Sequence, residues 1–441
     1  MPSRHIVIIG AGPGGYTAAF HAADLGLQVT LIDKNPNPGG ICLYQGCIPS
    51  KALLHAAKLM TDLRETEAIG ITCGEPKVDI EKLRAWKEGV TSRLTSGLGQ
   101  LTKARKITFI QGTAKFLNSS TIEAQKISGE AVMLSFDKAI IATGSSAVTL
   151  PFLPNSPRVW DAADALALPA IPEHLLVIGG GYIGLELGSA YAALGAKVSV
   201  VEALPQILSG MDKDLADILL RRLKKTFTKI RTATTVTSVE ETGSGLQVTL
   251  KDAKGAETKD AYSHILVAVG RRPNTKGLGL ENTKVRVTDR GFVAVDPKRQ
   301  TDDGNILAIG DVTGGPLLAH KAAFEGKIAA DAIAGKDVGY EPVGIPGVVF
   351  TDPELAWVGL TEQEATTAGQ DIAVSKFPWS ASGRALTLNR TDGMTKIIAD
   401  KNTSVVLGVG IVGVGAGDLI SEGALAVENK LKVQNLALTI H

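Results

Sequence analysis

Residues 6–15 read IVIIGAGPGG, an apolar, β-branched run that ends in a G-x-G-x-x-G turn. Residues 176–185 repeat the pattern as LVIGGGYIGL. Such a turn lets the backbone approach a pyrophosphate closely, and the helix that follows holds the anion at its N-terminus. Each copy therefore predicts a strand, a turn and a helix. The spaced glycines are Gly10, Gly12 and Gly15 in the first copy, and Gly179, Gly181 and Gly184 in the second.

The two copies continue in the same way. A helical stretch, YTAAFHAADLG or LELGSAYAALG, leads into a strand that ends in an acid, and 23 positions separate Gly10 from Asp33 and Gly179 from Glu202. An acid in this place accepts hydrogen bonds from a ribose, so the repeat predicts two dinucleotide sites rather than glycine turns that only pack a helix on a sheet. Glu202 would repel a 2′-phosphate, and EALPQ offers no arginine for one, which favours NAD over NADP at the second site.

Two of the three cysteines, Cys42 and Cys47, lie in GGICLYQGCIPSK at residues 39–51. A disulfide that closes so short a loop stabilises by only about 2 kcal/mol, so the pair is a poor structural link. The apolar-periodic stretch after Cys47 predicts a helix whose N-terminus lowers a thiol pKa, with Lys51 adding positive charge. We expect a pair that cycles between dithiol and disulfide, with two structural thiols as the alternative. Cys73 is expected to be a buried, inert thiol.

Further patterns divide the chain. KAIIATGSS (138–146) and HILVAVGRRPN (264–274) read as buried strands on either side of the second repeat, as expected for an inserted domain. Residues 304–326 predict strand, turn and helix, where Asp311 either meets a sugar-like hydroxyl or caps the helix. From about Ile345 the pattern becomes α+β, with a capping box in T-E-Q-E and a buried strand in VVLGVGIVGVGAG.

Composition excludes several classes of function. The 441 residues are 44% hydrophobic and 21% charged, with a formal net charge of +1, so no charge excess favours nucleic acid or a membrane surface. The longest apolar run is shorter than the roughly 20 residues of a membrane span. The start, MPSRHIVIIGAG, lacks the pattern of a signal peptide, so we expect a cytoplasmic protein. No metal site is expected.

With these residues in hand, the chain resembles the pyridine nucleotide–disulfide oxidoreductases, and within that family the bacterial dihydrolipoamide dehydrogenases of 2-oxo-acid dehydrogenase complexes. The resemblance covers the whole chain. It rests on GAGPGG, GGICLYQGCIPSKALLHAAK, ATGS, GGGYIGLE, VGRRPN, AIGDVTGGPLLAHKAAFEG and TDPELAWVGLTEQEA. It implies an α/β fold with two Rossmann-like domains and an α+β C-terminal domain. The implied domains are 1–146 for FAD, 147–270 for NAD, 271–344 as a central domain that completes the FAD site, and 345–441 for dimerisation.

The resemblance also implies an activity. Dihydrolipoamide would reduce a Cys42–Cys47 disulfide, and the electrons would pass to FAD and then as hydride to NAD. The chain would be a homodimer that receives the lipoyl domain of a dihydrolipoyl acyltransferase or of a glycine-cleavage carrier protein. Cys42 would exchange with the substrate, Cys47 would lie against the flavin, and Glu186 would pair with Lys51 beside the nicotinamide. The bland alternative for Lys51 and Glu186 is a pair of ordinary surface charges, and for His320 a capping or core histidine.

The implied cofactor contacts extend to many positions. Asp33 would take the FAD ribose, Asp311 the ribityl chain and Ala114 a backbone contact. Tyr182 would gate the nicotinamide pocket, and Glu202 would hold the NAD ribose with Val236 and Gly270 nearby. The remaining expected contacts are Gly14, Lys34, Gly39, Gly40, Ile41, Thr143, Gly144, Ser145, Leu317, Leu318, Ala319 and His320 for FAD, and Gly180, Ile183 and Leu185 for NAD.

One departure concerns the base that thiol exchange needs. The resemblance implies a histidine in a His-x-His-Pro pattern, contributed by the other subunit and held by a glutamate. The sequence ends LALTIH, and His441 matches only the first histidine of that pattern. We therefore expect the base and its glutamate to lie outside this sequence. A chain that truly ended here is expected to keep NADH-to-dye activity, to lose dihydrolipoamide oxidation and to dimerise more weakly.

Other functions remain open at this stage. Within the family, Glu202 argues against an NADP-dependent glutathione reductase, and the absence of extra terminal cysteines argues against a mercuric reductase. A non-catalytic flavoprotein that docks on an acyltransferase core is the alternative from a different class, and the intact cysteine pair argues against it.

Overall fold

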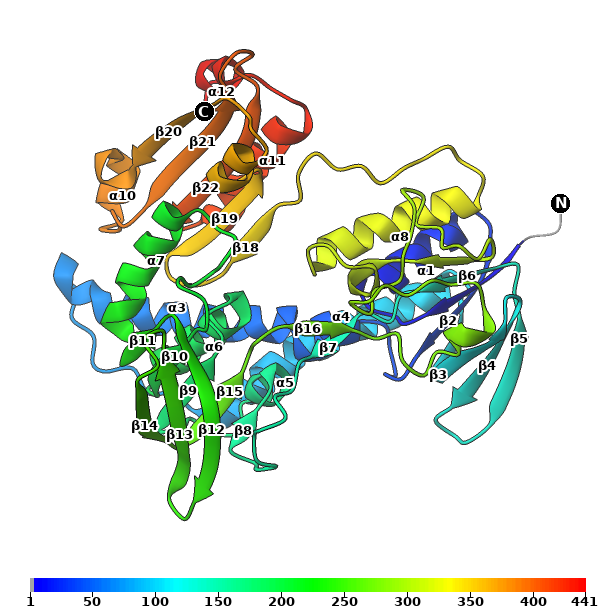
Figure 1. Ribbon diagram of the computed structural model, residues 1–441, viewed down its shortest axis with the longest axis horizontal. Coiled ribbons are helices and arrows are strands. Elements are labelled where there is room, and N and C mark those ends of the chain that lie inside the picture. Colours follow the sequence, from blue (N-terminus) through cyan, green and yellow to red (C-terminus); the bar gives the residue numbers. More distant parts are fainter. Residues whose placement is uncertain (1–3) are drawn as a thin grey trace. The chain divides into compact units, whose positions relative to one another are not determined.

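The computed structural model describes residues 4–441, which form two compact units (Figure 1). The first unit contains the residues up to Pro49, Ala85–Ala147 and Arg271–Glu341. The second contains Ser50–Arg84, Val148–Gly270 and Pro342–His441. Each unit is built around one of the two sequence repeats.

The first unit is centred on a seven-stranded sheet with the order β17-β6-β1-β2-β3-β4-β5. Strands β17 to β3 in this order are parallel, and β4 and β5 extend the sheet as an antiparallel meander. The short β-branched runs of the sequence thus become central strands buried on both faces. The bounds are β1 His5–Ile9, β2 Gln28–Asp33, β3 Thr108–Asn118, β4 Thr121–Lys126, β5 Ala131–Ser135, β6 Lys138–Ile141 and β17 Ile306–Ala308.

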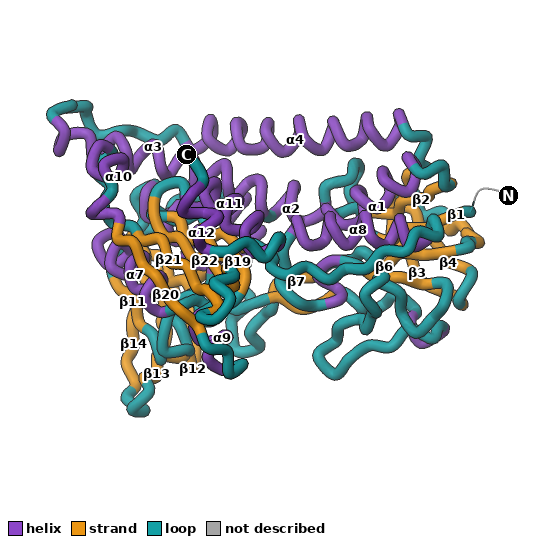
Figure 2. Tube along the Cα trace, turned by 90° about the horizontal axis from the view of Figure 1, so that it is seen from above, coloured by secondary structure: helices purple, strands orange, loops and turns teal. Residues whose placement is uncertain are grey.

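Two helices, α1 (Pro13–Asp24) and α8 (Ala319–Ile333), lie side by side in this unit (Figure 2). They approach closely because glycine faces glycine. A Cβ on Gly326 would lie 2.6 Å from the carbonyl oxygen of Gly14. Alanines on both helices and the apolar residues of the sheet fill the core beneath them.

Further elements complete the first unit and connect it to the second. Helices α3 and α4 each contain a boundary between the units. The bounds are α2 Gly40–Gln45, α3 Cys47–Glu65, η1 Thr66–Ile69, α4 Ile80–Ala104, β7 Ser145–Ala147, β16 Arg271–Pro273, η2 Leu280–Asn282 and η3 Gly310–Thr313.

The second unit repeats the plan with a five-stranded parallel sheet, β11-β10-β9-β15-β8, and an antiparallel meander, β12-β13-β14. Its core gathers the apolar residues of the sheet and of α6 and α7. The bounds are β8 Val159–Trp160, α5 Ala162–Ala167, β9 His174–Ile178, α6 Tyr182–Ala193, β10 Lys197–Val201, α7 Lys213–Thr226, β11 Lys229–Arg231, β12 Thr234–Thr242, β13 Gly245–Asp252, β14 Glu257–Tyr262 and β15 His264–Val267.

The C-terminal part of this unit is an antiparallel sheet, β18-β19-β22-β21-β20, covered by α11. The capping box is confirmed, because Thr361 and Glu364 exchange side-chain-to-backbone hydrogen bonds at the start of α9. The glycine-rich apolar run is the buried strand β22, as predicted. The bounds are β18 Gly347–Val349, β19 Glu354–Gly359, α9 Glu362–Thr367, β20 Ile372–Pro378, η4 Trp379–Ala381, α10 Gly383–Thr387, β21 Met394–Asp400, β22 Val406–Gly413, α11 Ala416–Glu428 and α12 Val433–Leu438.

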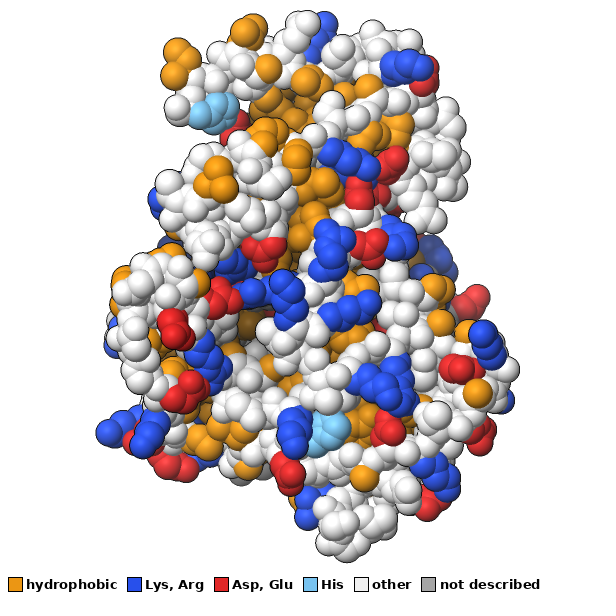
Figure 3. Space-filling view, turned by 90° about the vertical axis from the view of Figure 1, so that its left-hand side faces the viewer, with side chains coloured by type: hydrophobic (Ala, Val, Ile, Leu, Met, Phe, Trp, Pro, Cys, Tyr) orange, Lys and Arg blue, Asp and Glu red, His pale blue; other side chains and the backbone are white. Residues whose placement is uncertain are grey.

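The predicted α/β fold class is confirmed. Each unit contains parallel strands, one of which leads into a glycine turn, and the C-terminal part is α+β. One prediction is wrong: Cys73 is exposed and donates to the carbonyl of Leu63 at 3.1 Å, because it lies in the irregular stretch between η1 and α4. Within residues 4–441, no helix combines the length and apolar character needed to cross a membrane. Charged side chains of both signs are interspersed over the face in Figure 3.

Candidate active site

The first glycine turn joins β1 to α1, and its conformation requires glycine at two positions. Gly10 has φ +98°, and a Cβ there would lie 2.3 Å from the carbonyl oxygen of Ala142. A Cβ on Gly15 would lie 1.8 Å from the carbonyl oxygen of Gly10. Asp33 closes the turn, because its Oδ2 accepts a hydrogen bond from the Ala11 amide at 2.7 Å.

The second turn, between β9 and α6, has the same geometry. Gly179 has φ +111°, and a Cβ there would lie 2.4 Å from the carbonyl oxygen of Ala268. A Cβ on Gly184 would lie 2.2 Å from the carbonyl oxygen of Gly179. Glu202 replaces Asp33, and its Oε2 accepts from the Gly180 amide at 2.6 Å. The equal spacing in the sequence therefore corresponds to equal structure.

The middle glycine of each turn has a different role. Gly12 and Gly181 are the N-cap residues of α1 and α6, and neither helix has a side-chain cap. No atom lies within 4 Å of a Cβ placed on Gly181. The packing of the turn thus does not require glycine there, whereas the approach of a pyrophosphate to uncapped amides does. Both turns fit a dinucleotide by this test.

We expect Gly181→Ala to weaken NADH binding at least about tenfold while leaving the melting temperature unchanged, because the added methyl fills space that only a ligand would use. Fluorescence titration with NADH and thermal unfolding measure the two quantities. Gly89→Ala is the matched control, since a Cβ at Gly89 in α4 also meets no atom within 4 Å. Equal NADH affinity in both variants would contradict this assignment of Gly181.

The two cysteines lie next to the first turn. The segment before Cys42 rests on the glycine loop, where a Cβ on Gly40 would lie 2.5 Å from the Cα of Gly12. Helix α2 carries Cys42 and ends at Gln45, and α3 begins at Cys47. Gly46 allows this sharp connection, because a Cβ there would lie 2.9 Å from the Ile41 carbonyl oxygen. The glycines around the cysteines therefore place the thiols beside the nucleotide turn.

Tyr16 marks the position of both thiols. Burial is the main cause that raises the pKa of this phenol, and the charges of Cys42 and Cys47 raise it further. Both half-buried cysteines thus lie within electrostatic range of Tyr16. Tyr16 itself lies in the first turn of α1. Sequence reasoning missed Tyr16, and the only available signal was its place one residue after the glycine motif.

Lys51 and Glu186 meet within the second unit. The Lys51 Nζ lies 3.3 Å from Oε2 of Glu186, which also accepts from the Ser50 hydroxyl at 3.0 Å. Oε1 of Glu186 accepts from the Phe350 amide at 3.0 Å, and the Lys51 ammonium lies 4.3 Å from the centre of the Phe350 ring. Glu186 is only 3% exposed, so the interpretation of Glu186 as an ordinary surface charge is wrong. A carboxylate this buried requires its three donors.

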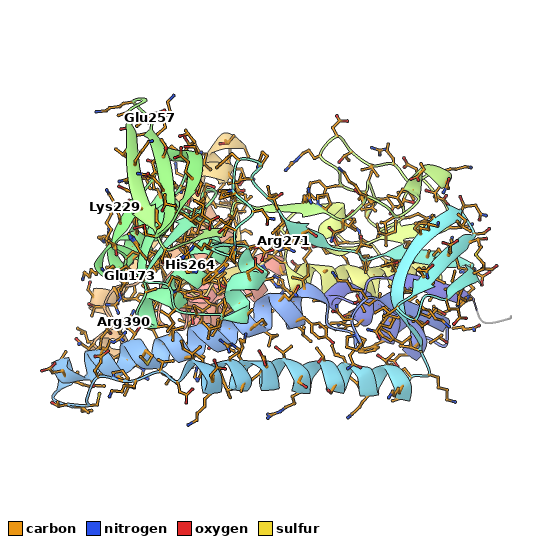
Figure 4. All side chains as sticks on the ribbon, turned by 90° about the horizontal axis from the view of Figure 1, so that it is seen from below. Glu173, Lys229, Glu257, His264, Arg271 and Arg390 are labelled. Carbon is orange, nitrogen blue, oxygen red and sulfur yellow. The ribbon has the colours of Figure 1, made fainter. Side chains whose placement is uncertain are left out.

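Asp311 meets a hydroxyl and an arginine rather than helix amides. Its Oδ2 accepts from the Ser145 hydroxyl at 2.5 Å and lies 4.0 Å from Nε of Arg271, which is labelled in Figure 4. The alternative of an N-cap is wrong, because the N-cap of α8 is Leu318, which offers no side-chain cap. Asp311 instead belongs to η3, a separate short turn ahead of that helix.

Several predicted contacts gather around these groups. Thr143 donates to the carbonyl of Asn274, and the Asn274 amide donates to Gly144, so the end of β6 is fixed beside β16. The Gly39 amide donates to Ala11, which ties the cysteine segment to the turn. The loop before α8 supplies Leu317 and Leu318, and the helix begins at Ala319; all three residues are half-buried.

Other predicted residues lie apart from the turns or face outward. Ala114 is buried in β3 opposite Ala124, in the part of the strand that pairs with the meander. Val236 lies in β12, two residues after the Thr234 amide that donates to Glu202. Gly270 follows β15 and accepts from Val148. Lys34, Ile41, Tyr182 and His320 are exposed, whereas Leu185 is buried and Ile183 half-buried in α6.

Sequence reasoning also missed one buried group of the first unit, Glu325. Glu325 of α8 is fully buried, and its Oε2 accepts from the Gly310 amide of η3 at 2.6 Å. Its Oε1 lies 2.8 Å from Nζ of Lys321 and 2.9 Å from Nη1 of Arg299. The contact with Lys321 is an ion pair, because its angles are too poor for a hydrogen bond.

Two nucleotide turns, one with a thiol pair beside it, define a dinucleotide-dependent oxidoreductase that acts on thiols or disulfides. The family model described as pyridine nucleotide-disulphide oxidoreductase matches residues 4–326. The dimerisation domain of the same family matches residues 345–441. The chain belongs to the pyridine nucleotide-disulphide oxidoreductase family, and it is an FAD- and NAD-dependent enzyme.

Relatives of known name agree along the whole chain. A dihydrolipoyl dehydrogenase of Vibrio parahaemolyticus is 44% identical over 439 residues, which cover 99% of this chain and 92% of the relative. That of Bacillus subtilis is 45% identical over 436 residues, with the same coverage. The crystal structure of LpdA from Mycobacterium tuberculosis superposes with a TM-score of 0.92 at 30% identity, covering 99% and 96% of the two chains. The HOCl-induced flavoprotein disulfide reductase RclA from Escherichia coli gives a TM-score of 0.88 at 30% identity, covering 99% and 96% of the two chains.

The comparisons confirm the predicted resemblance and the predicted cofactors, FAD and NAD. They also give the chain a dimerisation domain, as expected of a homodimer. Within residues 4–441, no three His, Cys, Asp or Glu side chains gather as a metal site.

Proposed function

We propose that the chain is a dihydrolipoyl dehydrogenase that uses Cys42 and Cys47 as its exchanging thiols. The observation that carries the proposal is the position of the thiol pair beside the first nucleotide turn. Gly40, two residues before Cys42, packs against Gly12 of that turn, and the charges of both cysteines help to raise the pKa of Tyr16. The named relatives, which align over 99% of the chain, support the choice of dihydrolipoamide as substrate.

The electrons balance across the thiol pair. One thiolate of dihydrolipoamide attacks Cys42, the Cys42–Cys47 bond breaks, and Cys47 leaves as a thiolate. The second substrate thiol then attacks the mixed disulfide and releases oxidised lipoamide and the Cys42 thiol. FAD, when bound, carries the resulting two electrons from the dithiol to NAD. Cys47 begins helix α3, where the amides of the first turn stabilise its thiolate.

Residues of the second unit prepare the nicotinamide side. Lys51 is held by Glu186, and Glu186 is held by Ser50 and the Phe350 amide, so the ammonium is fixed in place. We propose that Glu186 holds the positive charge of Lys51 in a fixed position beside the nicotinamide. The exposed ring of Tyr182, at the first position of α6, gates the space above the glycine turn.

An anaerobic titration with dihydrolipoamide, followed through the visible flavin spectrum, tests the proposed function. We expect reduction at one equivalent per flavin, with a long-wavelength band that requires a Cys47 thiolate next to the oxidised flavin. Cys47→Ser should not show the band. Reduction by NADH without any reduction by dihydrolipoamide would count against this substrate, and reduction by glutathione in its place would point to a different disulfide.

Glu202 is expected to decide between NAD and NADP. We predict that Glu202→Gln lowers the preference for NADH over NADPH at least about tenfold, because it removes the charge that repels a 2′-phosphate. The ratio of the two dissociation constants measures the effect. Glu173→Gln, a neutralised exposed carboxylate just before β9, is the control and should leave the ratio unchanged. A ratio that stays constant in Glu202→Gln would refute this role.

The partner and the location belong to the same proposal. A lipoyl domain, from a dihydrolipoyl acyltransferase or from a glycine-cleavage carrier protein, would deliver the substrate to a homodimer of this chain. The cytoplasm is the expected compartment. Pull-down with each lipoylated domain, and turnover with each as substrate, distinguishes the two carriers.

A further inference from the structure

A groove of about 1080 Å³ opens in the second unit, and none of its lining residues belongs to a glycine turn. Helix α7, the end of α3 with η1, and the loop between α10 and β21 form its walls. Five of its lining side chains are cationic and three are anionic. The charged lining residues are Arg64, Arg221, Arg222, Lys225 and Arg390, with Glu65, Glu67 and Asp392.

Two of the cations, Arg221 and Lys225, have no charged partner among residues 4–441. Arg221 and Lys225 lie four residues apart on α7, so they share one face of the helix. Both are exposed, and neither forms an ion pair or a side-chain hydrogen bond within residues 4–441. The groove thus holds an unbalanced positive charge.

Two of the three other arginines that line the groove, Arg222 and Arg390, are held by carboxylates. Arg222 pairs with Glu65 and, at 3.3 Å, with Asp352. Arg390, labelled in Figure 4, lies 2.6 Å from Asp352 and 3.1 Å from Asp392. Burial acts against their charge, yet the surrounding carboxylates raise the pKa of both. They therefore stay charged and preorganised at the base of the groove.

We propose that this groove binds a small anion with two or more linked phosphate groups. Guanidinium groups match phosphate oxygens in pairs, and Arg221 and Lys225 on one face of α7 can contact successive phosphates. The volume suits a ligand of nucleotide size rather than a single ion. Ile218 and Met394 add apolar wall on which the rest of such a molecule would rest.

The groove is connected to the Lys51–Glu186 pair by one loop. Asp352, which both arginines hold, lies two residues after Phe350, whose amide donates to Glu186. A phosphate that competes with Asp352 for Arg222 and Arg390 loosens this loop. Occupation of the groove therefore reaches the hydrogen bond that positions Glu186.

Calorimetric titration of the dimeric holoenzyme with inorganic tripolyphosphate at low salt tests the site. We expect one site per subunit and at least tenfold weaker binding in the double variant Arg221→Gln/Lys225→Gln. The matched control is Lys224→Gln/Lys229→Gln, which removes two exposed cations of the same unit that do not line the groove. Equal losses in both double variants would mean non-specific attraction and would overturn the proposal. Absence of binding to the holoenzyme, as when a second copy of the chain covers the groove, would overturn it too.

Hydrogen exchange of the Phe350 amide tests the connection without any activity measurement. With tripolyphosphate bound, we expect faster exchange in the wild type and no change in Arg221→Gln/Lys225→Gln. Binding that leaves this amide unchanged would overturn the link to Glu186. Neither readout depends on dihydrolipoamide, so a failure here is distinguishable from a failure of the proposed function.

Discussion

Cys42→Ser is expected to lower the rate of dihydrolipoamide oxidation at least about a thousandfold, the scale on which loss of an essential nucleophile acts. The serine keeps the size of the side chain, so α2 and the contact between Gly40 and Gly12 should persist. What disappears is the sulfur that forms a mixed disulfide with the substrate. Steady-state rates with dihydrolipoamide and NAD measure the loss.

The same variant should still pass electrons from NADH to an artificial dye, because that half of the reaction does not involve the thiols. Cys73→Ser is the matched control, since Cys73 is an exposed cysteine outside both nucleotide turns, and it should retain both activities. If Cys42→Ser oxidised dihydrolipoamide at a rate near that of Cys73→Ser, the thiol pair could not be the site of exchange.

The glycine turns were predictable because every signal for them is local. A β-branched strand, three spaced glycines, a helix and an acid all fall within 30 residues, and backbone sterics fix what glycine does there. The structure repeats the geometry in detail: in each turn, the amide of the residue after the first glycine donates a hydrogen bond to the acid. Sequence spacing is sufficient when the interacting groups are neighbours along the chain.

Pairs that meet across long stretches of sequence were not predictable from the residues. Lys51 and Glu186 are far apart in the chain, and only the family resemblance suggested that they meet. The role of Phe350 in holding Glu186 had no sequence signal at all. Nor did Glu325 differ from a surface glutamate: Lys321 and Glu325 have the spacing of a common exposed helix pair, yet both are buried.

Lys396 gives the second large prediction, because it is a buried lysine in the middle of β21. It is 1% exposed, and its Nζ lies 2.6 Å from Glu362, 2.9 Å from Asp212 and 3.2 Å from Asp214. Asp212 also accepts from the Glu362 amide at the start of α9. The cluster therefore joins the start of α7 to β21 and α9.

The charge cluster should contribute stability over a defined pH range. Burial acts against the charge of Asp214, but hydrogen bonds from Lys376 and Lys396 outweigh it and lower the pKa of Asp214. Burial likewise acts against Lys396, but Glu362 and Asp212 outweigh it and raise its pKa. A carboxyl group whose pKa is lowered by folding stabilises the folded state above its unfolded pKa of about 4, and this stabilisation is lost as the pH falls. A lysine whose pKa is raised by folding stabilises the folded state below its unfolded pKa of about 10.5, and this stabilisation is lost as the pH rises.

We expect Lys396→Met to lower the free energy of opening β21 by about 3 kcal/mol at neutral pH. Removing one partner of a buried ion pair typically costs about 3–5 kcal/mol, and the lower end applies because Asp214 and Glu362 keep part of their surface in water. Hydrogen exchange of the β21 amides reports this local free energy in a protein of several domains, where a single unfolding midpoint does not.

Lys401→Met is the matched control for this experiment. Lys401 follows β21 and pairs with Asp371 at 3.3 Å, but both side chains are largely exposed, so its loss should change the same free energy by less than about 1 kcal/mol. The difference between the two variants should shrink as the pH falls below about 4, because the Asp214 carboxylate, whose pKa is lowered by Lys376 and Lys396, then becomes protonated. A Lys396→Met protein as stable as Lys401→Met at neutral pH would mean that the cluster orders the contact between α7 and β21 without stabilising it.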